Sequence, residues 1–162
     1  NKKGNGGYGT RHPHHRLRRL CEELIQFAEP HYVYTAIAVT KNFVGSPHID
    51  ACDRSYQLAV SLGDFECGEL CVDEEGDGGI EAGDGEDAHG AAPSPQHRVA
   101  VVETRNRVAK VDGRYVHWVR TFHGGDRYSL IFYNTAAEPP QPRGPAVQSL
   151  CRLNSPPCRT GV

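Results

Sequence analysis

The sequence lacks a long hydrophobic run. Its longest apolar stretch, residues 35–40, contains threonine and has the length of a strand, whereas a membrane-spanning helix needs about 20 apolar residues. We therefore expect no integral membrane protein and no membrane partner. The chain opens on Asn1 without the charged, apolar and small-residue series of a signal peptide. These features favour an excised segment of an intracellular protein and leave the compartment open.

Cysteine is too sparse for a disulfide scaffold. The six cysteines among 162 residues lack the density and spacing of such a framework, so we expect reduced thiols. Only Cys67 and Cys71 stand close together, and no second pair follows at the spacing of a zinc finger or ribbon. A zinc site at this pair is an alternative that the spacing disfavours.

Charge is distributed unevenly along the chain. Residues 64–87 hold eleven acidic residues and no Lys or Arg, although the net charge of the whole chain is only −2. The first nineteen residues hold six of the basic ones. Composition therefore predicts a flexible basic arm at 1–15, a mobile acidic insertion at 73–97 and a proline-rich extended tail at 136–162. One domain at 16–135 remains.

Hydrophobic periodicity predicts one helix followed by strands. Apolar residues recur at helical spacing from Leu17 to Ala28, and Pro30 ends the pattern. Later segments have a period of two, which is typical of strands. They lie at 32–43, 55–62, 69–72, 98–104, 107–111, 115–119 and 128–134. This order predicts a mainly β fold, a sandwich or jelly roll with one N-terminal amphipathic helix.

The first predicted strand has two different faces. One carries Ala36, Ala38 and Thr40, whose small side chains suit the wall of a cavity. The other carries Ile37 and Val39, which suit a core layer beneath the helix. We therefore expect a cavity on the side of the small residues.

A metal site is indicated by His48 and Asp50, which follow the first strand. A histidine and an aspartate two residues apart can bind one ion, but chance alone gives roughly half a match of this kind in such a chain. A third ligand is offered by His117, a polar residue within the apolar and aromatic segment 115–119. His123 is the alternative, yet it falls in a glycine-rich turn where exposure is expected, so we prefer His117.

An anion site is indicated ten residues after His117. Arg127 and Ser129 alternate onto the same face of the last predicted strand. A buried guanidinium is costly unless an anion meets it. The arginine fork and a neighbouring hydroxyl are suited to a carboxylate.

Taken together, His48-x-Asp50, His117 and Arg127-x-Ser129 resemble the Fe(II)- and 2-oxoglutarate-dependent dioxygenases in order and spacing. The resemblance spans residues 32–134 and includes the sequence segments 62–70 and 112–119.

This resemblance implies a double-stranded β-helix, or jelly roll, over residues 16–135. His48, Asp50 and His117 would then be the catalytic metal ligands and bind Fe(II) as a 2-His-1-carboxylate triad. Arg127 and Ser129 would hold the distal carboxylate of the cosubstrate 2-oxoglutarate. Such enzymes use O2 to couple the oxidative decarboxylation of 2-oxoglutarate to hydroxylation or oxidative demethylation of a substrate, and ascorbate is a candidate reductant.

Two further residues are candidates for cosubstrate contacts. Tyr34 and Asn42 share the small-residue face of the first strand, which leads to His48. Trp118 alternates away from His117 and is expected in the core rather than at a substrate platform.

Two rival functions stay open. One is a non-catalytic jelly roll that binds a metal or a small acid and serves as an interaction module. The other is a zinc-dependent jelly roll of the cupin kind, which has no need of Arg127. For the dioxygenase, the sequence slightly favours a protein or peptide substrate, because the acidic insertion would repel phosphate. A nucleic acid and a small molecule remain alternatives.

Overall fold

The computed structural model describes residues 13–75, 98–136 and 138–153. The basic arm expected at 1–15 and the acidic insertion expected at 73–97 therefore lie mostly outside the described residues. The chain divides between residues 33 and 34 into two compact units, each of which is described by itself below.

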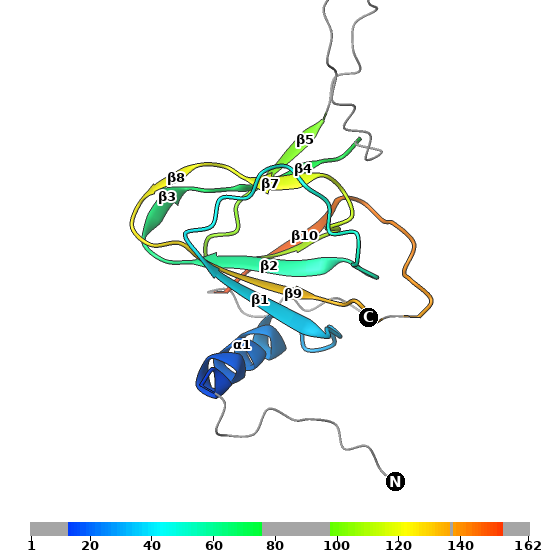
Figure 1. The fold of residues 1–162 in the computed structure, drawn as a ribbon, viewed down its shortest axis with the longest axis horizontal. Helices are drawn as coiled ribbons and strands as arrows, with labels where there is room; N and C mark the ends of the chain where they lie inside the picture. Colours follow the sequence, from blue (N-terminus) through cyan, green and yellow to red (C-terminus); the bar gives the residue numbers. More distant parts are fainter. Residues whose placement is uncertain (1–12, 76–97, 137, 154–162) are drawn as a thin grey trace, which may run out of the picture. The chain divides into compact units, whose positions relative to one another are not determined.

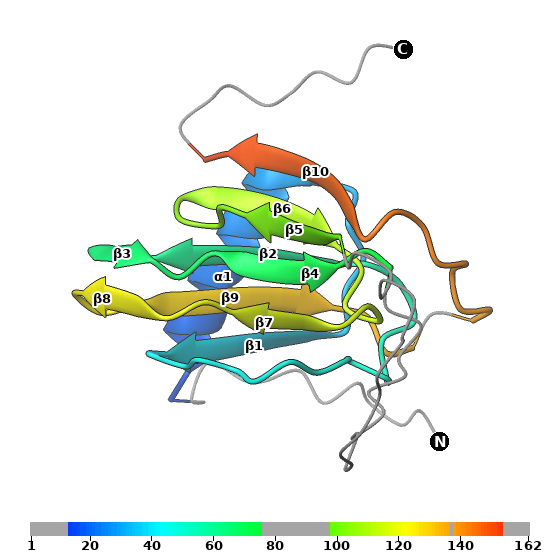
Figure 2. The same ribbon diagram turned by 90° about the horizontal axis from the view of Figure 1, so that it is seen from above.

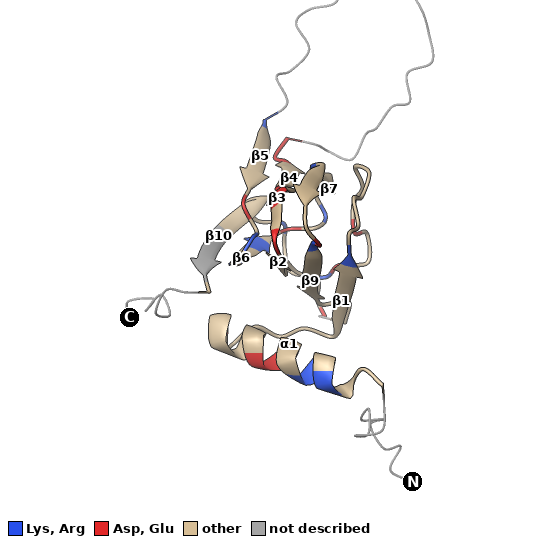
Figure 3. Cartoon of the chain, turned by 90° about the vertical axis from the view of Figure 1, so that its left-hand side faces the viewer, with Lys and Arg blue, Asp and Glu red and all other residues tan. Residues whose placement is uncertain are grey.

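The first unit contains helix α1, His15–Ala28, as the periodicity predicts. Arg18 and Arg19 pair with Glu22 and Glu23 one turn later, at 2.7 and 2.8 Å, which is the spacing that stabilises exposed helices. Figure 3 shows these charged residues along α1. Among the described residues, no helix is long and apolar enough to cross a membrane.

The described part of the second unit contains ten strands in antiparallel pairs (Figure 1). The largest sheet, sheet A, has the order β1-β9-β2-β6-β10, which Figure 2 shows from above. Its strands are β1 (Ala36–Lys41), β2 (Gln57–Leu62), β6 (Arg107–Val111), β9 (Tyr128–Tyr133) and β10 (Val147–Arg152).

Two smaller sheets complete this unit. Sheet B has the order β5-β4-β7 and consists of β4 (Leu70–Asp73), β5 (Val99–Val102) and β7 (His117–Val119). Sheet C is a short pair of β3 (Phe65–Cys67) and β8 (Phe122–Gly124). The chain passes repeatedly between sheets A and B, so strands that are consecutive in sequence are mostly not neighbours in a sheet.

The core of this unit lies between sheets A and B. Leu70, Val72 and Val102 of sheet B form one buried cluster with Ala109 and Val111 of β6. Alternating side chains of each strand reach this layer because a strand has a period of two. Sheets A and B are therefore held together by apolar burial, as a mainly β fold requires.

The seven predicted strands are all present, although most are shorter than expected. β3 and β8 were not predicted, because three residues are too few to show a period. β10 was not predicted either, since it lies in the proline-rich segment at 136–162. That segment is therefore not only an extended tail: Val147–Arg152 is the edge strand of sheet A, where a preceding proline is tolerated.

Of the two faces predicted for β1, the structure bears out the cavity wall but not the core layer. Ala38 and Thr40 line a pocket, as the small-residue face predicts. The opposite face is less buried than a core layer, because Val39 is 42 % exposed. β1 is an edge strand of sheet A, and this position leaves that face less covered.

We predict that Phe132→Ala destabilises the fold by about 3–5 kcal/mol, which is typical for removal of a buried phenylalanine. Phe132 has no exposed surface and lies in β9, between β1 and β2 of sheet A. Phe43→Ala is the matched control, because Phe43 is 55 % exposed. Urea unfolding of the two variants measures the difference, and equal losses would contradict this account of the core.

Candidate metal centre and pocket

The loop after β1 is fixed to β7 by its backbone. The N–H of His48 donates to the carbonyl of His117 at 3.1 Å, and the N–H of His117 donates back to His48 at 2.9 Å. Two residues on, the N–H of Asp50 donates to the carbonyl of Gly113 at 2.8 Å. These backbone bonds bring together residues that are far apart in the sequence.

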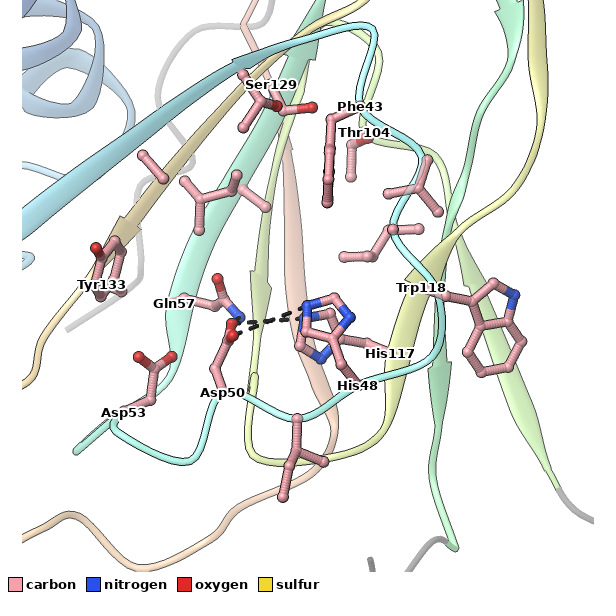
Figure 4. A pocket seen from close by; sticks show the side chains of 18 of the residues that line it. Phe43, His48, Asp50, Asp53, Gln57, Thr104, His117, Trp118, Ser129 and Tyr133 are labelled. Carbon is pink, nitrogen blue, oxygen red and sulfur yellow. Dashed lines mark hydrogen bonds and ion pairs between the residues drawn. The ribbon is translucent and has the colours of Figure 1, made fainter. Parts of the chain in front are cut away.

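The three predicted metal ligands form one cluster (Figure 4). His48 and His117 direct Nε2 toward the carboxylate of Asp50, at 3.9 Å from Oδ1 and 3.6 Å from Oδ2. One ligand atom from each residue lies within 4.8 Å of the others. Among the described His, Cys, Asp and Glu side chains, these three form the candidate metal site.

Hydrogen bonds fix the orientation of both imidazoles. Nδ1 of His48 lies 2.7 Å from the carbonyl of Ser46, and Nδ1 of His117 lies 2.9 Å from that of Tyr115. A carbonyl can only accept, so each neutral ring carries its proton on Nδ1 and keeps a lone pair on Nε2. Two nitrogen lone pairs and a carboxylate therefore converge, which is the environment of a cation.

The ligands differ in burial. His117 is buried, whereas the side chains of His48 and Asp50 are 44 % and 40 % exposed. Burial lowers the pKa of His117, while its bond to Tyr115 and the charge of Asp50 act in the opposite direction and His48 adds to the lowering. A lowered pKa keeps this imidazole in the neutral form that binds metals.

Gln57 orients the carboxylate of Asp50. This buried residue of β2 donates from Nε2 to Oδ2 of Asp50 at 3.0 Å. A Cβ on Gly113 would lie 2.0 Å from the same Nε2, so glycine makes room for the amide. Gln57 was not among the predicted site residues. A polar residue on a buried strand, two positions before Ala59 of the pocket wall, is the signal that could have indicated it.

Asp53 is a second polar residue that the sequence analysis did not identify. It follows the metal-ligand loop, its backbone N–H donates to Asp50 at 3.0 Å, and its Oδ2 is buried without a hydrogen-bond partner. Burial, together with the negative charges of Asp50 and Asp112, raises the pKa of Asp53 to about 7, and Arg114 acts against this rise.

Arg127 and Ser129 are buried together. Nη1 of Arg127 donates to Oγ of Ser129, while its Nε is buried with no partner. The guanidinium lies 5.5 Å from the ring of Phe65 and 5.9 Å from that of Phe122. Burial lowers the pKa of Arg127, with the charge of Glu103 opposing, but arginine stays charged at neutral pH. A buried cation with an unused donor fits an anion.

One pocket of about 430 Å³ joins the metal cluster to this arginine. His48, Asp50 and His117 line it, and so do Arg127 and Ser129. In Figure 4, Ser129 lies at one end of the pocket and the Asp50 carboxylate faces the histidines toward the other. The structure therefore brings all five predicted site residues to a single cavity.

Tyr34 and Asn42 do not line this pocket, which contradicts their predicted role as cosubstrate contacts. Asn42 instead joins the end of β1 to the start of β9: its Oδ1 accepts from the N–H of Arg127 and its Nδ2 donates to Asp126, both at 2.8 Å. Tyr34 packs edge-on against Phe132, with ring centroids 5.4 Å apart.

The remaining candidates lie outside the metal cluster. His123 is exposed and 3.1 Å from Glu66, although it belongs to β8 rather than to a turn. Cys67 is exposed, Cys71 is buried, and both are free thiols. Trp118 is half-buried and among the residues that line the pocket, so it is not the core residue that was expected, although Figure 4 shows its ring directed away from His117.

Comparison with protein families found no family model that matches this chain, and comparisons with curated proteins and with solved structures found no significant match.

We predict that His48→Ala weakens Fe(II) binding by more than about 100-fold, since loss of a ligand exceeds the 10- to 100-fold cost of losing an outer partner. The fold should persist because His48 is largely exposed. Anaerobic calorimetry with Fe(II) measures the affinity, with His123→Ala as the matched control. Equal affinities in the two variants would place the metal elsewhere.

Gln57→Leu should weaken Fe(II) binding by about 10- to 100-fold, because the carboxylate of Asp50 loses the amide that orients it. Gln148→Leu, at an exposed position, serves as the control. The same calorimetry applies, and unchanged affinity in Gln57→Leu would remove Gln57 from the site.

Proposed function

We propose that this protein is an Fe(II)- and 2-oxoglutarate-dependent dioxygenase that hydroxylates or oxidatively demethylates its substrate. One observation carries the proposal: a two-histidine, one-carboxylate cluster and a buried, incompletely paired arginine line the same pocket. A cluster of this composition with open positions is typical of non-haem Fe(II) oxygenases.

The strand order supports a jelly roll as the scaffold. Sheet A places β9 between β1 and β2, and sheet B places β4 between β5 and β7. The isolated pairing of His48 with His117 continues sheet B beyond β7. Two antiparallel sheets joined by repeated crossings are the arrangement of a double-sheet jelly roll.

Each predicted residue then has a distinct task. His48, Asp50 and His117 would hold Fe(II), and three residues are fewer than the ion's full set of ligands. Arg127 and Ser129 bind the distal carboxylate of 2-oxoglutarate, which sets the orientation of the 2-oxo acid toward the metal. The bound iron supplies the redox chemistry with O2. The apolar pocket walls limit the access of water to the reaction.

We predict that Fe(II) followed by 2-oxoglutarate gives a visible charge-transfer band in anaerobic solution. Arg127→Lys should raise the half-saturating concentration of 2-oxoglutarate by about 10- to 100-fold, because lysine keeps the charge but loses the planar fork, and hydrogen bonds to charged groups contribute about 1.5–3 kcal/mol. Its affinity for Fe(II) should change little.

Arg105→Lys is the matched control for this titration. Arg105 also stands beside the Phe65 ring, at 5.8 Å, but it is exposed and does not line the pocket. Iron binding without any visible band would favour the non-catalytic metal-binding module instead. A band with equal 2-oxoglutarate affinity in both variants would move the anion site away from Arg127.

A further inference from the structure

Asp53 is a buried carboxylate that the proposed chemistry does not use. It is 5 % exposed, lines the pocket, and has a buried Oδ2 without a hydrogen-bond partner. An unpaired buried carboxylate is costly, and proteins usually pair such groups with a cation or a set of donors. A cationic group that arrives with a ligand would stabilise the ionised form of Asp53, which burial and its acidic neighbours disfavour.

The surrounding charges do not supply that cation. Asp53 faces two further carboxylates, Asp50 and Asp112, and one guanidinium, that of Arg114. Arg114 already forms a bidentate ion pair with Asp112. Nε of Arg114 lies 2.7 Å from Oδ1 of Asp112, and Nη2 lies 2.6 Å from Oδ2. Asp50 is oriented by Gln57 toward the metal site. Asp53 is left as the carboxylate with an unsatisfied oxygen.

Asp53 lies at the end of the pocket that 2-oxoglutarate would not occupy. Figure 4 places Asp53 and Tyr133 on one side of Asp50, and Ser129 at the far end. Ser129 is bonded to Arg127, so the carboxylate-binding end and Asp53 lie at different ends of the view in Figure 4. The pocket therefore has an anion-binding end and a second end of opposite charge.

The walls of this pocket suit an aliphatic chain that ends in a charge. Ala38, Ala59 and Ile131 line it from three neighbouring strands of sheet A. Apolar walls of this kind accommodate the methylene stem of a basic side chain, whose charged head needs a polar partner. The ring of Tyr133 offers a second contact for a cation.

We propose that the substrate carries an alkylammonium or guanidinium group, as on a lysine or arginine side chain of a peptide, and that Asp53 binds this group. The proposal rests on the proposed function, because the metal cluster marks the reacting end of the pocket. The backbone bond between Asp53 and Asp50 places the cationic head beside the metal site. The methylene or methyl groups next to the nitrogen are then the carbons presented for oxidation.

The test uses the iron-loaded protein with 2-oxoglutarate and O2. Four nine-residue peptides share a Gly/Ser/Ala sequence and differ at the central residue, which is lysine, arginine, norleucine or citrulline. Succinate release above the peptide-free rate is measured for each. We expect the lysine or the arginine peptide to stimulate release at least 10-fold more than its neutral counterpart, norleucine or citrulline respectively.

Two variants assign this preference to Asp53. Asp53→Asn removes the charge at nearly constant shape and should lower the ratio of basic to neutral stimulation by at least 10-fold, whereas Asp53→Glu keeps the charge and should preserve part of the ratio. Asp64→Asn, at an exposed position, is the matched control. The visible 2-oxoglutarate band shows that each variant is folded and loaded.

The outcomes separate this inference from the proposed function. Absence of the band in the unmodified protein would overturn the proposed function itself. A normal band with no preference for the basic peptides, or with stimulation only by a single-stranded oligonucleotide, would overturn the substrate class. Loss of Fe(II) affinity in Asp53→Asn to the extent seen in Gln57→Leu would assign Asp53 to the metal centre instead.

Discussion

The pairing of His48 with His117 is the constraint on which the candidate site depends. Two backbone hydrogen bonds join a loop to a three-residue strand, and each partner is itself a candidate metal ligand. Main-chain bonds do not require a metal, so the ligands are positioned by the fold before any ion arrives. The bond from Asp50 to Gly113 extends the same attachment by two residues. A preorganised site of this kind holds its ligands close to the geometry of the bound state.

The two ends of the pocket carry side chains of opposite charge. One end holds the buried guanidinium of Arg127, and the other holds the carboxylates of Asp50 and Asp53, with the two imidazoles beside them. Arg127 favours an anionic group at one end of the pocket, and Asp53 and Asp50 favour a cationic group at the other. The walls between the two ends are mostly apolar and accommodate chains of different length.

Much of the fold and the three candidate metal ligands follow from local patterns in the sequence: strand period, the His-x-Asp spacing, and a polar residue within the apolar segment of His117. The rest depends on contacts between distant segments. Gln57 and Asp53 gain their positions from contacts with the loop that carries Asp50, and a buried polar residue on a strand does not by itself show which partner it meets. Tyr34 and Asn42 were misplaced because alternation was extended beyond the ends of β1: Tyr34 precedes the strand, and Asn42 follows it with a φ of 54°.

Gly113 limits which substitutions this part of the sequence can accept. Its own atoms supply only a backbone carbonyl to Asp50, yet a Cβ there would lie 2.0 Å from Gln57 Nε2 and 3.0 Å from Asp53 Oδ2. Any other residue would displace the amide that orients the Asp50 carboxylate and crowd the buried carboxylate of Asp53. One missing methyl group therefore links the candidate metal site to Asp53, and a side chain here would disturb both at once.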